Sequence, residues 1–246
     1  MKSYDELFTL RGSTYDQAMT AFPDARRAEF DQLFRNCKPD AGSRVGDIPA
    51  GGGYLKSYLS SGCEWVGHEP CASFTNHGAV EVGQPGHPLL PVPWPDAHVD
   101  IVCSLAGVHH LEDKRPLFAE IHRVTRPGGR FVLSDVEHGS AVSAFLDGFV
   151  GEWNSTGHEG LYLGENTLAE LEGAGWEVEH AATSNFHWQF AERPDMAAFC
   201  SRLFDITRAS ADQIDNAIED MLGTTRLPDG GTAMNWSLFT ITCVKR

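Results

Sequence analysis

The sequence predicts an α/β fold, a doubly wound and mostly parallel sheet covered by helices on both faces. Short apolar stretches alternate with helical stretches between residues 44 and 134, a pattern typical of parallel strands joined by crossover helices. The first apolar stretch runs directly into a turn at 49–53 that is rich in glycine, and such turns bind ligands in many doubly wound sheets. With this one alternating pattern, the 246 residues are expected to form a single domain, 1–246.

Residues 1–42 are expected to form a helical cap that precedes the sheet. Pro23 lies in the first turn of a second helix, a position that proline occupies readily. The apolar side chains between Ala25 and Cys37 recur at helical spacing. The run Pro-Asp-Ala-Gly at 39–42 ends this helix.

Residues 43–137 are expected to form the core that binds the ligand. Strands are predicted at 44–48, 64–69, 99–104 and 130–134, with a weaker candidate at 79–82. Helices are predicted at 54–59 and 115–125.

The pattern changes after Asp135. Helices are predicted at 140–149, 166–173, 194–207 and 211–222, and strands at 176–183 and 236–244. Two helices between the last two strands are more than a minimal connection requires. Residues 185–235 are therefore expected to form a helical lid insertion over the edge of the sheet.

Composition excludes several classes of partner. The formal net charge is −15 and no run of Lys and Arg occurs, which argues against nucleic acid as a partner. No stretch approaches the roughly 20 apolar residues of a membrane span, and the first residues lack the apolar centre of a signal peptide. We therefore expect a cytoplasmic protein with no membrane partner, either a monomer or a homodimer. The six cysteines have no metal-ligand spacing and are expected to be reduced.

The turn after the first predicted strand carries the strongest sign of a ligand. Its glycines permit a tight turn and a close approach of backbone to ligand. Glu69 ends the second predicted strand, 22 positions after Asp47, a spacing that suits a carboxylate accepting hydrogen bonds from ribose hydroxyls. A glycine turn without a ligand is the alternative. The P-loop sequence is absent, and the glycine spacing differs from that of dinucleotide dehydrogenases, which makes a dehydrogenase the less favoured choice.

Several segments together resemble the class I S-adenosylmethionine (SAM)-dependent methyltransferases. The run Asp47-Ile48-Pro49-Ala50-Gly51-Gly52-Gly53 resembles the Asp-x-Gly-x-Gly-x-Gly motif of that family, with Pro49 in place of the usual first glycine. Further resemblances, all in the family's order, lie at 67–70, 93–102, 106–111 and 120–129. Over residues 40–137 the resemblance implies a seven-stranded sheet, SAM as cofactor and S-adenosylhomocysteine as product.

The resemblance also implies a set of cofactor-binding residues. Tyr15, in the N-terminal helices, is expected to face the sulfonium together with Tyr4, and Arg11 is expected to pair with the cofactor carboxylate; simple packing roles are the alternative. The family's usual acid near the adenine is missing at 86–91, so apolar contacts are expected there. The complete predicted set is Arg11, Tyr15, Asp47, Pro49, Ala50, Gly51, Gly53, Glu69, Pro70, Leu89, Leu90, Ser104 and Leu105.

Histidines at the same edge of the sheet are the candidates for acid–base chemistry. His109 and His110 follow the fourth strand of the family's order, and His138 follows the fifth. An imidazole titrates near neutral pH and suits a general base for a hydroxyl acceptor, although each residue could be structural. His158 and Tyr162 lie in a glycine-rich loop that could face a substrate. No metal site is predicted.

The predicted function is transfer of a methyl group from SAM to a small molecule. Aromatic and aliphatic side chains within 185–235 pack a core first of all, but some could also roof an apolar pocket. The acceptor is then expected to be an aromatic or otherwise hydrophobic metabolite. Two alternatives remain: a SAM-binding enzyme that catalyses cyclisation or decarboxylation, and a binding protein without catalysis.

Overall fold

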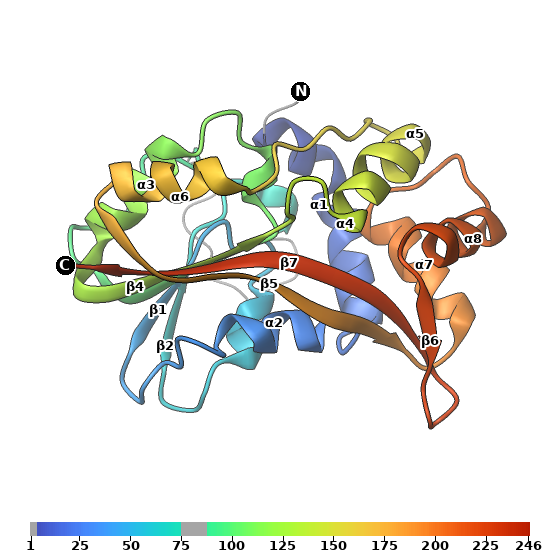
Figure 1. The fold of residues 1–246 in the computed structure, drawn as a ribbon, viewed down its shortest axis with the longest axis horizontal. Helices are drawn as coiled ribbons and strands as arrows, with labels where there is room; N and C mark the ends of the chain where they lie inside the picture. The colour runs from blue at the N-terminus through green and yellow to red at the C-terminus, as the bar shows by residue number, and fades with distance from the viewer. Residues whose placement is uncertain (1–3, 75–87) are drawn as a thin grey trace.

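The computed structural model describes residues 4–74 and 88–246, in which a mixed sheet lies between helices on both faces (Figure 1). The seven strands of the sheet are arranged in the order β2-β1-β3-β4-β7-β5, and β6 pairs with β7. The strands are β1 (Arg44–Asp47), β2 (Glu64–Gly67), β3 (Val99–Leu105), β4 (Thr125–Asp135), β5 (Trp176–Phe190), β6 (Thr224–Arg226) and β7 (Thr232–Lys245).

The predicted doubly wound α/β fold is confirmed. Strands β2, β1, β3 and β4 pair in parallel, whereas β7 runs antiparallel to β4, β5 and β6. Because parallel neighbours end at the same edge, the segments that follow β1, β2, β3 and β4 meet at one place. The predicted strand at 79–82 lies outside the described residues.

The helices cover the sheet on two sides. In Figure 1, α3 (Arg115–Val124) and α6 (Glu165–Gly173) lie above the sheet and α2 (Arg27–Leu33) lies below it. Helix α3 shows why these helices pack against the sheet. Its apolar residues recur on one face, and Leu117, Phe118 and Ile121 are fully buried.

Two predicted helices take a different form. Residues 54–59 form a short 3₁₀ helix (Tyr54–Tyr58). The predicted helix at 140–149 is α4 (Ala141–Phe145), whose first turn is capped by the Ser140 hydroxyl, followed by a π-helical turn (Leu146–Val150) and α5 (Gly151–Trp153). The wider π turn changes the spacing of side chains along this segment, which the prediction of one continuous α-helix at 140–149 does not include.

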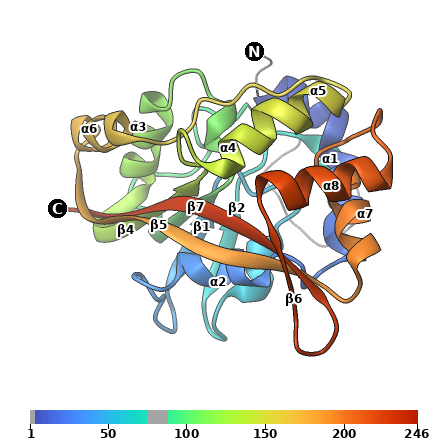
Figure 2. The same cartoon turned by 45° about the vertical axis from the view of Figure 1, so that its right-hand side comes forward.

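The predicted lid boundaries, 185–235, are wrong, because they cut through two long strands. β5 and β7 are 15 and 14 residues long and pair in antiparallel orientation. This pair, here called the hairpin arm, extends beyond the other strands (Figure 2). On this arm Phe186, Trp188 and Phe190 alternate with exposed residues, the period-two burial of a strand covered on one face. The helices between the two strands are α7 (Arg193–Leu203) and α8 (Ala211–Met221).

The N-terminal helix α1 (Tyr4–Ala21) packs against α7, and both lie beside the carboxyl edge of the parallel strands (Figures 1 and 2). Within residues 4–74 and 88–246, no helix combines the length and the apolar content of a membrane span.

A buried ion pair joins α2 to the hairpin arm. Arg26 donates two hydrogen bonds to Glu29, at 2.8 and 2.6 Å, and Trp188 Nε1 of β5 donates to Glu29 Oε2 at 2.7 Å. Both charged residues are almost fully buried. Removal of one partner would therefore leave the other charge buried and unpaired.

Substitution Glu29→Ala is expected to lower the free energy of unfolding by about 3–5 kcal/mol, because it leaves Arg26 uncompensated and Trp188 Nε1 without an acceptor. Urea denaturation followed by circular dichroism measures the change. The control Asp31→Asn, on the exposed face of the same helix, is expected to stay within about 0.5 kcal/mol of the wild type. A loss below about 1 kcal/mol for Glu29→Ala would contradict this account.

Candidate active site

The turn after β1 is tied to the end of β2. Ala50 N donates to His68 O at 3.0 Å, and Gly53 N donates to Ala50 O at 2.9 Å. Gly51 and Gly53 have φ values of 53° and 73°, a region that glycine adopts without strain. Pro49 is accommodated because it lies against Gly107, where a Cβ atom would approach Pro49 Cγ to 2.7 Å.

Glu69 connects three segments at the carboxyl edge of the sheet. Its side chain is almost fully buried and accepts hydrogen bonds from Gly51 N at 2.8 Å, Cys71 N at 2.9 Å and Tyr4 Oη at 2.9 Å. Burial raises the pKa of Glu69 to about 7, although these hydrogen bonds oppose the shift. The carboxylate therefore connects the glycine turn of the sheet to helix α1.

A pocket, here called the turn pocket, lies over this turn. Among the predicted cofactor residues it is lined by Tyr15, Asp47, Pro49, Ala50, Gly51 and Leu105. Tyr4, Phe8, Arg26, Tyr54, Phe74, Ala106 and Gly107 complete most of the wall.

The remaining predicted cofactor residues do not line the turn pocket. Gly53, Glu69 and Pro70 border it through the turn and the end of β2. Ser104 is fully buried within β3. Leu89 is buried and Leu90 half-buried, and both pack against the core of β3 and α3. The predicted adenine contacts of these two leucines thus stay a prediction, and residues 86 and 87 of that segment lie outside the described residues.

A second pocket, here called the imidazole pocket, adjoins the first. Phe8, Tyr15, Arg26 and Ala106 line both cavities. Its wall combines three histidines with the aromatic side chains of the hairpin arm and the helices next to it. The further lining residues are Arg11, Glu29, His109, His110, Val136, Leu146, His158, Trp188, Leu203, Phe204, Trp236 and Leu238.

His109 is held by a buried carboxylate at the end of β4. Its Nδ1 lies 2.6 Å from Asp135 Oδ1, while Asp135 Oδ2 accepts from Val108 N and His109 N at 2.8 and 3.1 Å. Burial favours the neutral acid, but the charge and hydrogen bonds of His109 and the neighbouring amides outweigh it, so the pKa of Asp135 is lowered. The ionised carboxylate assigns the proton to Nδ1 and leaves Nε2 as an acceptor.

His158 forms a second pair of the same kind. Its Nδ1 lies 3.0 Å from Asp147 Oδ1, which also accepts from Gly160 N at 3.0 Å and Tyr162 Oη at 2.5 Å. Burial lowers the pKa of His158, partly offset by Asp147. Near neutral pH this ring is therefore mainly uncharged.

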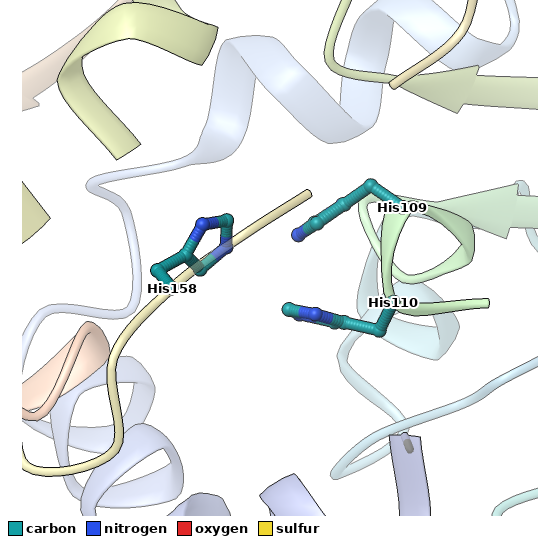
Figure 3. A group of neighbouring side chains, drawn as sticks. All are labelled: His109, His110 and His158. Atoms are coloured by element: carbon teal, nitrogen blue, oxygen red, sulfur yellow. The ribbon is translucent and has the colours of Figure 1, made fainter. Parts of the chain in front are cut away.

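The rings of His109, His110 and His158 gather around one space (Figure 3). The centroid of the His109 ring lies 4.0 Å from that of His110 and 5.5 Å from that of His158. Burial, followed by the positive charges of the other two histidines, Arg11 and Lys114, holds the pKa of His110 well below its usual range. His110 is therefore neutral under physiological conditions.

This group has a donor set that a transition metal would accept. Its nitrogen atoms lie within 4.8 Å of one another, and carboxylates behind two of the rings resemble those behind many metal-bound histidines. The positive charges of Arg11 and Lys114, which depress the pKa of His110, oppose a divalent cation. The expectation of a metal-free site therefore stays a prediction.

His138, the other predicted catalytic histidine, is not part of this group. It is exposed, and its backbone N–H donates to Leu163 O at 2.8 Å. It lines neither the turn pocket nor the imidazole pocket. His158 instead occupies the position expected for His138, because the loop after α5 folds back to the edge of the sheet.

Asp135 and Asp147 are functional candidates that the sequence analysis missed. Asp135 ends a strand at the ligand-binding edge, a position that could have identified it. Asp147 lies in the π turn after α4, and no sequence signal marks it.

Arg11 lies beside the imidazole pocket rather than the turn pocket. It is 3% exposed and lines the imidazole pocket but not the turn pocket. Tyr15 lies between the two cavities, and its hydroxyl oxygen accepts a hydrogen bond from Arg26 Nη1. The predicted pairing of Arg11 with a cofactor carboxylate is thus not supported by its position.

Comparison with known proteins agrees with this geometry. Residues 47–133, which run from the glycine turn to β4, match the family described as "Methyltransferase domain". Over this central segment the chain is similar to methyltransferases. The methyltransferase YcgJ of Bacillus subtilis is 30% identical over 147 residues, which cover 56% of this chain and 57% of YcgJ.

Another methyltransferase matches over a shorter stretch. The 27-O-demethylrifamycin SV methyltransferase of Amycolatopsis mediterranei is 41% identical over 46 residues, 19% of this chain and 17% of that protein. In both comparisons the matched part spans less than two thirds of the relative's length.

Solved structures share the methyltransferase fold over much more of the chain. The crystal structure of YcgJ superposes with a TM-score of 0.61 at 18% identity, covering 89% of this chain and 99% of YcgJ. The crystal structure of the cyclase SpnF superposes with a TM-score of 0.59 at 14% identity, covering 99% of this chain and 97% of SpnF. At these identities the likeness concerns the fold alone.

Proposed function

We propose that this protein binds SAM in the turn pocket and methylates a small molecule held in the imidazole pocket. One observation carries the proposal: the two cavities share Phe8, Tyr15, Arg26 and Ala106 as lining residues. A methyl donor over the family's glycine turn would therefore face the cavity that contains His109.

The turn pocket suits the chemistry of SAM. Glu69 presents a buried carboxylate beside Gly51 N, and the ribose hydroxyls of a nucleoside would compete with Tyr4 Oη for it. The aromatic rings of Phe8 and Tyr15, where the cavities adjoin, would stabilise a nearby sulfonium. When bound, SAM would supply the electrophilic methyl group.

In this proposal His109 is the general base. Its Nε2 would accept the proton of an acceptor hydroxyl as that oxygen takes the methyl group and the bond between methyl and sulfur breaks, which leaves S-adenosylhomocysteine. The imidazolium would then be stabilised by Asp135 at 2.6 Å. The proton would leave to solvent after product release. The walls of the two cavities would hold acceptor and methyl group close together and in line, which supplies much of the rate enhancement of such a displacement.

A reaction without methyl transfer is the second candidate, because the cyclase SpnF has the same fold. The oriented pair of His109 and Asp135 favours a reaction that removes a proton. Product mass separates the two candidates: a gain of one methyl group with release of S-adenosylhomocysteine supports methylation, and an isomer of the substrate without that release supports cyclisation.

The proposal is tested by incubating the protein with methyl-labelled SAM and a panel of phenols, phenolic carboxylates and aromatic amines. Substitution His109→Gln is expected to lower kcat by about 10²- to 10⁴-fold, the typical contribution of a general base. The KM for SAM should stay unchanged, because His109 does not line the turn pocket.

His138→Gln is the matched control and should keep wild-type kcat, since that residue is exposed and outside both pockets. Equal effects of the two substitutions would contradict the assignment of the base.

Cofactor affinity is expected to depend on pH through Glu69. Because its pKa is raised to about 7, the carboxylate that accepts the ribose hydroxyls forms as pH rises through that value. Calorimetric titration should therefore show tighter S-adenosylhomocysteine binding at about pH 8 than at about pH 6. Glu69→Gln should bind more weakly at both values and lose this dependence, whereas an unchanged profile in Glu69→Gln would exclude Glu69 as its source.

Removal of metal ions is expected to leave activity intact. Protein dialysed against a chelator should retain wild-type kcat, because a base, and not a metal-bound oxygen, activates the acceptor. Loss of activity that added zinc restores would show that the three histidines act as metal ligands.

A further inference from the structure

The guanidinium of Arg11 is a buried charge without a counter-ion in contact. The residue is 3% exposed, and its one hydrogen bond within residues 4–74 and 88–246 is a long one, from Nη2 to Leu203 O at 3.4 Å. Its Nε and Nη1 atoms are buried and donate to no described residue. Burial lowers the pKa of Arg11 to about 10, against the longer-range attraction of Asp205, so the group stays charged at neutral pH.

The other arginine of the same pocket is fully neutralised. Arg26 is paired through two hydrogen bonds with Glu29, which also accepts from Trp188. Glu29 is the only carboxylic acid among the described residues that line the imidazole pocket. Among the side chains that line the pocket, the guanidinium of Arg11 is therefore left without a carboxylate partner.

Unpaired buried charges are costly and rare in folded proteins, and they mark sites that receive an opposite charge from a ligand. The surrounding wall indicates the rest of that ligand. Trp188 and Trp236 are stacked, with centroids 4.2 Å apart and planes at 23°, and Phe204 lies beside them. These flat surfaces suit an aromatic frame.

We propose that Arg11 binds the carboxylate of the methyl acceptor, and that the acceptor is an aromatic carboxylic acid whose hydroxyl group faces His109. This rests on the proposed function and names its substrate class. A guanidinium recognises a carboxylate through two parallel hydrogen bonds. Nη2 offers such an edge together with Nε or Nη1, because its bond to Leu203 O is long, at 3.4 Å. In a chain of net charge −15, a local cation is needed to attract an acid.

The alternative partner is the carboxylate of SAM. The position of Arg11 argues against this alternative, because Arg11 lines only the imidazole pocket, whereas Arg26 lines both pockets. Arg11 also lies close enough to His110 and His158 to lower the pKa of each. The arginine and the histidine base thus border one cavity.

The test measures binding of 4-hydroxybenzoate, salicylate and the neutral analogue 4-hydroxybenzamide, with S-adenosylhomocysteine present and absent, by calorimetry. At least one of the acids should bind about tenfold or more tightly than the amide. Arg11→Gln should remove that preference and change affinity for S-adenosylhomocysteine by less than about twofold. Arg226→Gln, on an exposed residue of β6, is the matched control and should change neither.

Protein stability provides a second readout. Because Arg11 has no paired acid, Arg11→Gln should retain or raise Tm, and its fold is checked by circular dichroism. Arg11→Lys, which keeps the charge but loses the two-point geometry, should retain part of the preference for the acid.

Three results would overturn the proposal: no acid of the panel binds, the amide binds as well as the acids, or Arg11→Gln loses affinity for S-adenosylhomocysteine while its preference for acids remains. The last would assign Arg11 to the cofactor. Failure of the wild type to bind S-adenosylhomocysteine would refute the proposed function. In that case, a preference for acids measured in the absence of S-adenosylhomocysteine would still support the anion site at Arg11.

Discussion

The buried carboxylate of Asp135 organises the catalytic edge of this fold. It accepts from the backbone N–H groups of Val108, His109 and Val136 and holds Nδ1 of His109. One side chain at the end of β4 thus sets both the path of the loop after β3 and the tautomer of the histidine on that loop. Because parallel strands end together, the same edge also contains the glycine turn after β1 and Glu69 after β2.

Charge in this acidic protein is arranged in two different ways around the cavities. Arg26 and Glu29 neutralise each other and join α2 to the hairpin arm, so their role is structural. Arg11 has no such partner, and the neutral rings of His110 and His158 next to it carry no opposite charge. In the proposed function, the imidazole pocket receives a ligand that is both apolar and anionic, whereas Glu69, beside the turn pocket, accepts hydrogen bonds from a neutral sugar.

Much of the fold and half of the site could be predicted from sequence, for identifiable reasons. The parallel strands are short apolar runs, and the turn and Glu69 lie within 25 residues of each other, so local patterns identify them. His158 and Asp147 reach the site only through the loop after α5, and no local pattern shows which distant loop returns to an edge. The predicted lid bounds cut through the hairpin arm because polar residues alternate with apolar ones along β5, and no local pattern shows how far that strand continues. Spacing alone also cannot show that Arg11 lines only the imidazole pocket, whereas Tyr15, one turn of α1 away, lines both pockets.

The most direct test of the central claim is a crystal structure of the protein with S-adenosylhomocysteine and an aromatic acid that it binds. The account predicts the ribose at Glu69 and the sulfur atom where the two cavities adjoin. It also predicts the hydroxyl of the acid within hydrogen-bond distance of His109 Nε2. A nucleoside bound away from the glycine turn, or an acid separated from the sulfur by a closed wall, would contradict the claim that these two cavities form one methyl-transfer site.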